Sequence, residues 1–132
     1  MSRGTGDAAE PVRLVPPEGR VPGHATPGMV REEAVATPGL WAGLVRTASG
    51  DVSGWHHHGE FETSIYVVSG QLRMESGPGG AVVLEAKPGD FLYVPPGAVH
   101  REANPGGGES HLVVVRAGSG PPVVNVPGPA PA

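Results

Sequence analysis

Alternating apolar and polar residues run through the middle of the chain and predict β-strands. In one such stretch Gln71, Arg73 and Glu75 alternate with Leu72 and Met74, which would place the two sets on opposite faces of a strand. Residues 30–36 fit a short strand or a brief helical turn. The same signals, with β-branched and aromatic residues, predict further strands at residues 41–48, 55–58, 63–69, 81–86, 91–95, 100–102 and 111–116.

Turn signals separate these strands. Residues 77–80 read Gly-Pro-Gly-Gly, and residues 87–90 read Lys-Pro-Gly-Asp. No segment shows a convincing helical period. Several short strands divided by such turns predict an all-β sandwich or barrel, and we expect an antiparallel jelly-roll β-barrel.

The two ends differ in composition from the middle. The chain has 132 residues with 22 Gly and 16 Pro, and much of this excess lies at the ends. A chain of this length is expected to form one domain. We therefore predict a Pro/Gly-rich arm at residues 1–28, a barrel at residues 29–117 and a Pro/Gly-rich tail at residues 118–132. One copy of each motif predicts a single barrel.

Composition and charge exclude several classes of function. The net charge is −4 with no basic cluster, so a nucleic-acid partner is not expected. No apolar run is long enough to span a bilayer, and the N-terminal residues lack the apolar core of a signal peptide, so a cytoplasmic protein is expected. The chain has no Cys, which excludes disulfides and thiolate chemistry. Any transition metal must therefore be held by nitrogen and oxygen ligands.

The histidines suggest such a site. His56 and His58 are two residues apart in a predicted strand, so both side chains point to one face, while His57 points to the other. His100 follows a bend at residues 95–97 that can bring a third imidazole alongside. Three neutral imidazoles suit Fe(II), Mn(II), Ni(II), Cu(II) or Zn(II).

Two stretches of the chain carry recognisable spacings. Residues 50–58 contain G-x5-H-x-H. The second stretch reads G-x5-P-x-G-x2-H-x3-N, and its fixed positions are filled by Gly89, Pro95, Gly97, His100 and Asn104. Together they resemble the paired motifs of the cupin family, small β-barrels that commonly hold one metal ion. The resemblance implies that His56, His58 and His100 are metal ligands.

The fourth ligand is where the sequence departs from the family pattern. The family usually has an acid three or four residues after the second His, and Glu62 satisfies that count. The spacing back from Gly70 points instead to Thr63, and a slip of one residue exchanges the faces of a strand. We expect Glu62 to be the ligand, through a β-bulge, because a carboxylate is the better oxygen ligand for a dication. Thr63 and Glu60 are the alternatives.

Fold and metal do not determine a reaction. We expect a metal-dependent enzyme that acts on a small organic substrate, with an O2-using dioxygenase as the leading hypothesis. The alternatives are a metal-dependent isomerase or lyase and a non-catalytic barrel that binds a small ligand. Because the Pro-rich arm can cover an exposed strand edge of a second copy, we also expect a homodimer.

Overall fold

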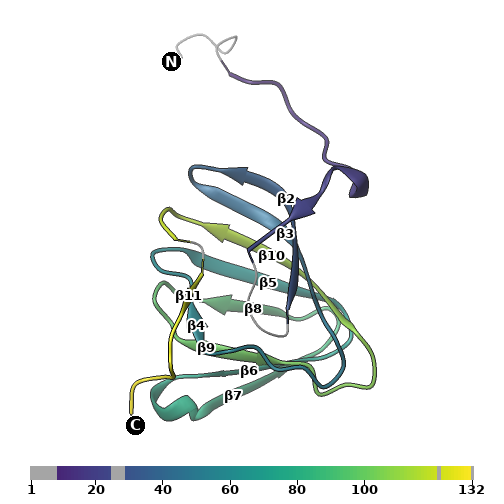
Figure 1. Cartoon of the computed structure of the whole chain (residues 1–132). Coiled ribbons are helices and arrows are strands. Elements are labelled where there is room, and N and C mark those ends of the chain that lie inside the picture. The colour runs from purple at the N-terminus through teal and green to yellow at the C-terminus, as the bar shows by residue number, and fades with distance from the viewer. Residues whose placement is uncertain (1–8, 25–28, 122, 132) are drawn as a thin grey trace.

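Two antiparallel β-sheets lie against each other in the computed structural model, which describes residues 9–24, 29–121 and 123–131 (Figure 1). The larger sheet has the strand order β1 (Val21–Pro22), β2 (Val30–Thr37), β3 (Leu40–Thr47), β10 (Ser110–Ala117), β5 (Glu62–Ser69) and β8 (Phe91–Val94). The smaller sheet has the order β11 (Val124–Asn125), β4 (His56–His57), β9 (His100–Ala103), β6 (Leu72–Ser76) and β7 (Val82–Ala86). Two short 3-10 turns, η2 (Pro17–Gly19) and η3 (Pro78–Gly80), complete the elements.

This arrangement confirms the predicted all-β jelly roll, with one difference. Hydrogen bonding within the described residues does not close the two sheets into a continuous barrel. The larger sheet ends at β1 and β8, and the smaller one at β11 and β7. Residues 30–37 form a strand, which decides between the two expectations for that segment.

The core forms because inward residues alternate along the paired strands. In β10 and β5, Leu112 pairs with Val67 and Val114 with Ile65, and these four side chains are buried. The predicted alternation in β6 is also confirmed, since its apolar residues are buried. The apolar core consists of Met29, Trp41, Val45, Ile65, Val67, Leu72, Met74, Ala86, Val94, Leu112 and Val114.

Polar side chains are buried in the same interior. They come from both sheets, so the space between the sheets has an apolar part and a polar part. Burying polar and charged groups is costly unless they are paired, so this concentration of them indicates a site. Its members include Arg31, His56, His58, Thr63, His100, Glu102 and Arg116.

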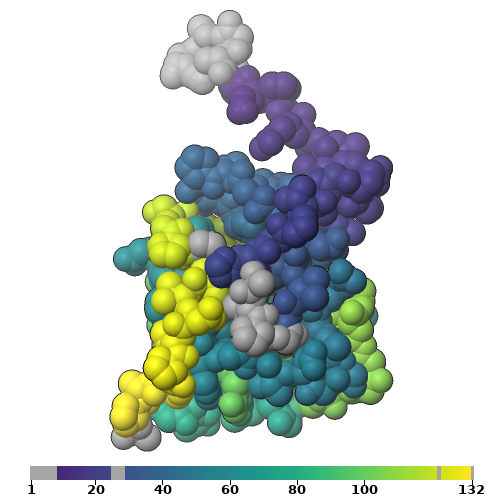
Figure 2. Space-filling model, in the orientation of Figure 1, coloured from purple at the N-terminus to yellow at the C-terminus, as the bar shows by residue number. Residues whose placement is uncertain are grey.

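The two ends of the chain behave differently. Residues 9–16 extend away from the sheets, and the side chains of Val12 and Leu14 are almost fully exposed (Figures 1 and 2). The tail runs back along the body instead, where β11 pairs with β4 and Val123 is buried. We expected this tail to lie outside the barrel. It pairs because the edge of β4 would otherwise leave unpaired backbone groups.

None of the helices in the described part of the chain has the length and apolar character needed to cross a membrane.

Candidate metal centre

Four buried side chains converge inside the polar part of the interior: His56, His58, His100 and Glu102. Each offers one ligand atom, and these atoms all lie within 4.8 Å of one another. The ring centroids of the three imidazoles are separated by 4.4 to 5.2 Å. Nitrogen and carboxylate oxygen donors gathered at this spacing could hold one divalent transition-metal ion.

Strand register explains how these residues meet. His56 in β4 pairs directly with His100 in β9. His58 lies two residues after His56, and Glu102 two residues after His100, so each shares the inward face of its neighbour. The expected meeting of the three histidines is therefore found.

Two of the imidazoles are oriented by the backbone. The Nδ1 atom of His56 lies 2.9 Å from the carbonyl oxygen of Gly54, and Nδ1 of His100 lies 2.9 Å from that of Ala98. A carbonyl can only accept, so each Nδ1 carries the proton and each Nε2 presents a lone pair. In the neutral rings both Nε2 atoms are buried and meet no hydrogen-bond donor among the described residues, although Oε1 of Glu102 lies 3.2 Å from that of His100. Buried lone pairs of this kind are what a metal site requires.

Glu102 supplies the negative charge of the cluster. Its Oε1 atom lies 3.2 Å from Nε2 of His100 and 3.9 Å from Nε2 of His56. Burial raises the pKa of the Glu102 carboxyl, but when the rings are protonated a hydrogen bond from His100 and the charges of His100, His56 and Arg31 outweigh this and lower it to about 2. Burial also lowers the pKa of His56, partly opposed by Glu102, which favours the neutral ring that binds metals.

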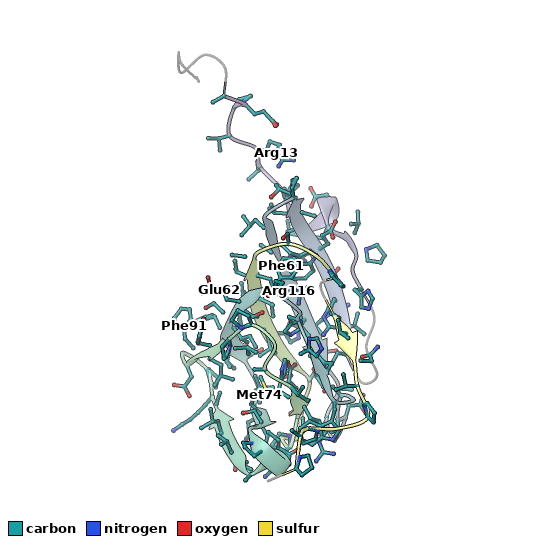
Figure 3. All side chains as sticks on the ribbon, turned by 90° about the vertical axis from the view of Figure 1, so that its left-hand side faces the viewer. Arg13, Phe61, Glu62, Met74, Phe91 and Arg116 are labelled. Atoms are coloured by element: carbon teal, nitrogen blue, oxygen red, sulfur yellow. The ribbon has the colours of Figure 1, made fainter. Side chains whose placement is uncertain are left out.

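Glu62 lies outside this cluster, so the expectation that it is the fourth ligand is wrong. Its side chain is exposed, and its Oε1 atom accepts a hydrogen bond of 3.1 Å from the hydroxyl of Tyr93. The bulge that we expected is absent from this part of β5: Glu62 pairs with Ala117 and Thr63 with Arg116 in regular register. Simple alternation therefore turns Glu62 outward (Figure 3) and Thr63 inward, where Thr63 is 1% exposed. Glu60 is exposed as well.

The acid in the cluster, Glu102, was missed by sequence reasoning. The signal was available, because the alternation that places His56 and His58 on one face applies equally to His100 and Glu102. The family pattern places an acid near the first motif, which is why Glu62, Thr63 and Glu60 were the expected candidates. In this chain the carboxylate comes from β9 instead of β5.

The remaining histidines lie outside the cluster, as expected. His57 is half-buried, and its Nδ1 accepts a hydrogen bond of 3.0 Å from the backbone N–H of Gly59. His111 is half-exposed, with its Nε2 atom 2.9 Å from Oε1 of Glu109. His24 is exposed.

Two pockets reach the cluster from different directions. One is mainly apolar and includes Met74, Leu92, Val94 and His100 in its wall. The other is lined by polar and apolar side chains, among them Arg31, His58, Thr63, Glu102 and Arg116. The four-residue cluster thus borders both an apolar and a polar space, each of them small.

Comparison with known families agrees with this fold. Residues 43–116 match the family model described as "Cupin domain". This match covers more than half of the chain, so the chain belongs to the cupin family. A search of curated proteins finds no match.

Solved structures of the same fold have different functions. The polyketide cyclase RemF from Streptomyces resistomycificus is 20% identical with a TM-score of 0.71, and the match covers 87% of this chain and 85% of that one. KdgF from Halomonas sp. is 21% identical with a TM-score of 0.68, covering 82% and 96%. An oxalate oxidase is 24% identical with a TM-score of 0.63, covering 76% and 56%. At these identities the likeness shows the fold alone.

Proposed function

We propose that this protein is a metal-dependent enzyme in which His56, His58, His100 and Glu102 hold one divalent transition-metal ion. The observation that carries the proposal is the pair of buried Nε2 lone pairs that have no partner among the described residues while both Nδ1 atoms are fixed by carbonyls. Orienting an imidazole through its second nitrogen is the usual support of a metal ligand.

The rest of the site suits a small organic substrate. Four protein ligands leave positions open on a six-coordinate ion, where a bound metal would supply either O2 chemistry or polarisation of a substrate oxygen. Thr63 faces the same pocket, and its Oγ1 atom is buried without a partner among the described residues. We propose that this hydroxyl positions the substrate by hydrogen bonding, while the apolar pocket beside His100 excludes water.

A dioxygenase is the reaction that we propose to test first. Imidazole and carboxylate ligands without thiolate, combined with open positions, suit Fe(II) and O2. The oxalate oxidase and the polyketide cyclase share the fold but differ in chemistry, so their names do not choose between oxidation and a redox-neutral reaction.

The first experiment measures metal binding. Chelator-treated protein is equilibrated with Fe(II) under anaerobic conditions and, separately, with Mn(II), Ni(II), Cu(II) and Zn(II), and the metal content is determined by elemental analysis. We expect one ion per chain, and strong loss of binding in His56→Ala and His100→Ala. His111→Ala is the matched control, because that ring lies outside the cluster. Wild-type protein that binds none of these metals contradicts the proposal.

The second experiment measures turnover. The iron-loaded protein is screened for O2 consumption with a panel of small organic compounds, and the other metal forms are screened for isomerisation and elimination products. Turnover without O2 uptake supports a redox-neutral enzyme instead of a dioxygenase. Stoichiometric metal binding without turnover in any form supports the non-catalytic binding barrel.

A further inference from the structure

Two arginines are buried beside the metal cluster, although neither belongs to it. Arg31 of β2 is 5% exposed and Arg116 of β10 is 1% exposed. Both project into the interior because alternation along their strands turns them inward. They line the same pocket as His58 and Glu102, a small pocket with a cavity volume of about 10 Å³, close to the room that one water molecule needs. Figure 3 shows Arg116 inside the ribbon, whereas Glu62 and Phe91 lie on its outer side.

The guanidinium group of Arg116 is held in place by stacking, but two of its donor atoms have no acceptor among the described residues. Its Cζ atom lies 4.2 Å from the centre of the Trp41 ring, and the indole Nε1 of Trp41 donates a hydrogen bond of 2.9 Å to Glu33. The stacked ring fixes the plane of the guanidinium. Yet its Nε and Nη2 atoms are buried and make no hydrogen bond to any described residue. Buried donors of a charged group are rarely left without an acceptor.

The charges in this pocket do not balance. Among the described residues that line it, Glu102 is the one acid, against the guanidinium groups of Arg31 and Arg116. Among these lining residues the positive charges outnumber the negative by one, and a divalent ion in the cluster would raise the excess to three. Burial lowers the pKa of Arg116 to about 10, so this group is charged at neutral pH. Buried charge without a counter-charge is costly, which favours an anion as the missing occupant.

We propose that this pocket binds the carboxylate group of a small organic acid, held by the planar fork of Arg116 beside the metal cluster, with Arg31 as the second cation. The inference rests on the proposed function and narrows its substrate class. Arg116 suits a carboxylate because its donors lie in one plane and match two oxygens at once. Because the cavity is so small, we propose that only the carboxylate group of the acid enters it, and that the rest of the ligand stays outside.

The test measures ligand binding by calorimetry in chloride-free buffer. Metal-loaded protein is titrated with acetate, with oxalate and with acetamide, which has the size of acetate but no charge. We expect both carboxylates to bind at least about tenfold more tightly than acetamide, because a charged partner replaces a neutral one. Equal affinity for acetate and acetamide would overturn the proposal.

Variants assign the effect to Arg116. Arg116→Gln should weaken carboxylate binding by about tenfold or more and leave metal content unchanged. Arg116→Lys keeps the charge but loses the planar pair of donors. Its carboxylate affinity should therefore lie between that of wild-type protein and that of Arg116→Gln. The matched control is Arg73→Gln, because Arg73 is partly exposed and pairs with Glu85 at 3.6 Å. If Arg116→Gln does not fold, Arg116→Lys decides, and wild-type carboxylate affinity in either folded variant overturns the proposal.

Metal content is measured in parallel, which separates this inference from the proposed function. If no metal binds, the proposed function fails, while the same titrations on metal-free protein still test the arginines. Metal-free protein should also prefer acetate to acetamide, because the buried donors of Arg116 remain without an acceptor among the described residues. If Arg116→Gln loses the preference for acetate, the result supports the carboxylate site. If metal-free wild-type protein shows no such preference, the result overturns the proposal.

Discussion

Which carboxylate belongs to the metal cluster depends on a single step along a strand. Thr63 occupies the inward position of β5 and Glu62 the outward one. The Glu62 carboxylate therefore accepts a hydrogen bond from Tyr93 at the surface. Glu102 reaches the imidazoles from β9, within 3.2 Å of His100. The site therefore retains a carboxylate while taking it from a different element.

This arrangement predicts opposite outcomes for two similar substitutions. Glu102→Gln should lower metal affinity by more than about tenfold, since losing only an outer partner of a ligand already costs about 10- to 100-fold. Glu62→Gln should leave the affinity unchanged, because that side chain is exposed on the outer face. Competition with a metallochromic indicator measures both, and a large effect of Glu62→Gln alone would contradict the geometry.

The hydrogen bond between Tyr93 and Glu62 predicts that removing the Glu62 carboxylate changes the pKa of Tyr93. The hydrogen bond to the Glu62 carboxylate raises the pKa of Tyr93 above its usual value, because the carboxylate accepts the phenol proton and opposes its loss. Glu62→Gln should lower that pKa. A raised pKa in the folded state means that the hydrogen bond stabilises the fold below pH of about 10 and that this stability is lost at higher pH.

Ultraviolet difference titration of the phenolate follows this change. Phe replaces Tyr66 in both the parent and the variant, so that Tyr93 is the remaining tyrosine. An unchanged titration midpoint after Glu62→Gln would show that the hydrogen bond is absent in solution.

At the level of elements, the tail strand β11 supports the centre. Val124 pairs with His57 and Asn125 with His56, so β11 lies directly against the strand that carries a ligand. Gly79 also donates a backbone hydrogen bond of 2.7 Å to Ala130. Val123 is 7% exposed, although it does not belong to the main core cluster. The tail therefore does more than cover the surface.

Deleting residues 121–132 should consequently destabilise the protein. Loss of one buried valine and two or three backbone hydrogen bonds corresponds to roughly 2 to 4 kcal/mol in the free energy of unfolding. Urea denaturation measures this, and hydrogen exchange at His56 and His57 should become faster. Deleting residues 127–132 is the control that keeps β11. A change below about 0.5 kcal/mol, typical of surface substitutions, would contradict the role of β11.

Much of the fold was predictable because its central strands alternate clearly. Leu72 and Met74 face the core as their spacing indicates, and the second motif places His100 correctly. The tail strand was not predictable, since Val124 and Asn125 form a strand through pairing with β4 and not through a pattern of their own. The inward arginine of β10 was likewise hidden, because an Arg in an apolar strand normally marks its outer face.

At the level of the whole molecule, two apolar surfaces remain without cover. Val12 and Leu14 extend on the arm at residues 9–16, and they are almost fully exposed. Val83 and its neighbours on β7 are half-exposed, and among the described residues β7 pairs with β6 alone. An apolar strand with an open edge is a site for another chain.

We therefore expect a homodimer in which the arm of one copy lies on the other. Sedimentation velocity should give a dimer for the full chain, and removing residues 1–16 should shift it to monomer without loss of the fold. Val83→Lys should weaken the dimer, whereas Val52→Lys, at an exposed valine elsewhere, should not. A monomer at every protein concentration would contradict this expectation.

The cluster also has a consequence for folding. It joins residues 56–58 to residues 100–102, so an ion bound there would cross-link two distant parts of a chain that has no cysteine. Because the four side chains meet only in the folded chain, the ion would bind the folded state and not the unfolded one, and at a metal concentration a thousandfold above Kd it would add about 4 kcal/mol of stability. Calorimetric melting with and without chelator measures this contribution. The ion would then hold the two segments together reversibly, and the supply of metal would set the stability of the fold as well as its chemistry.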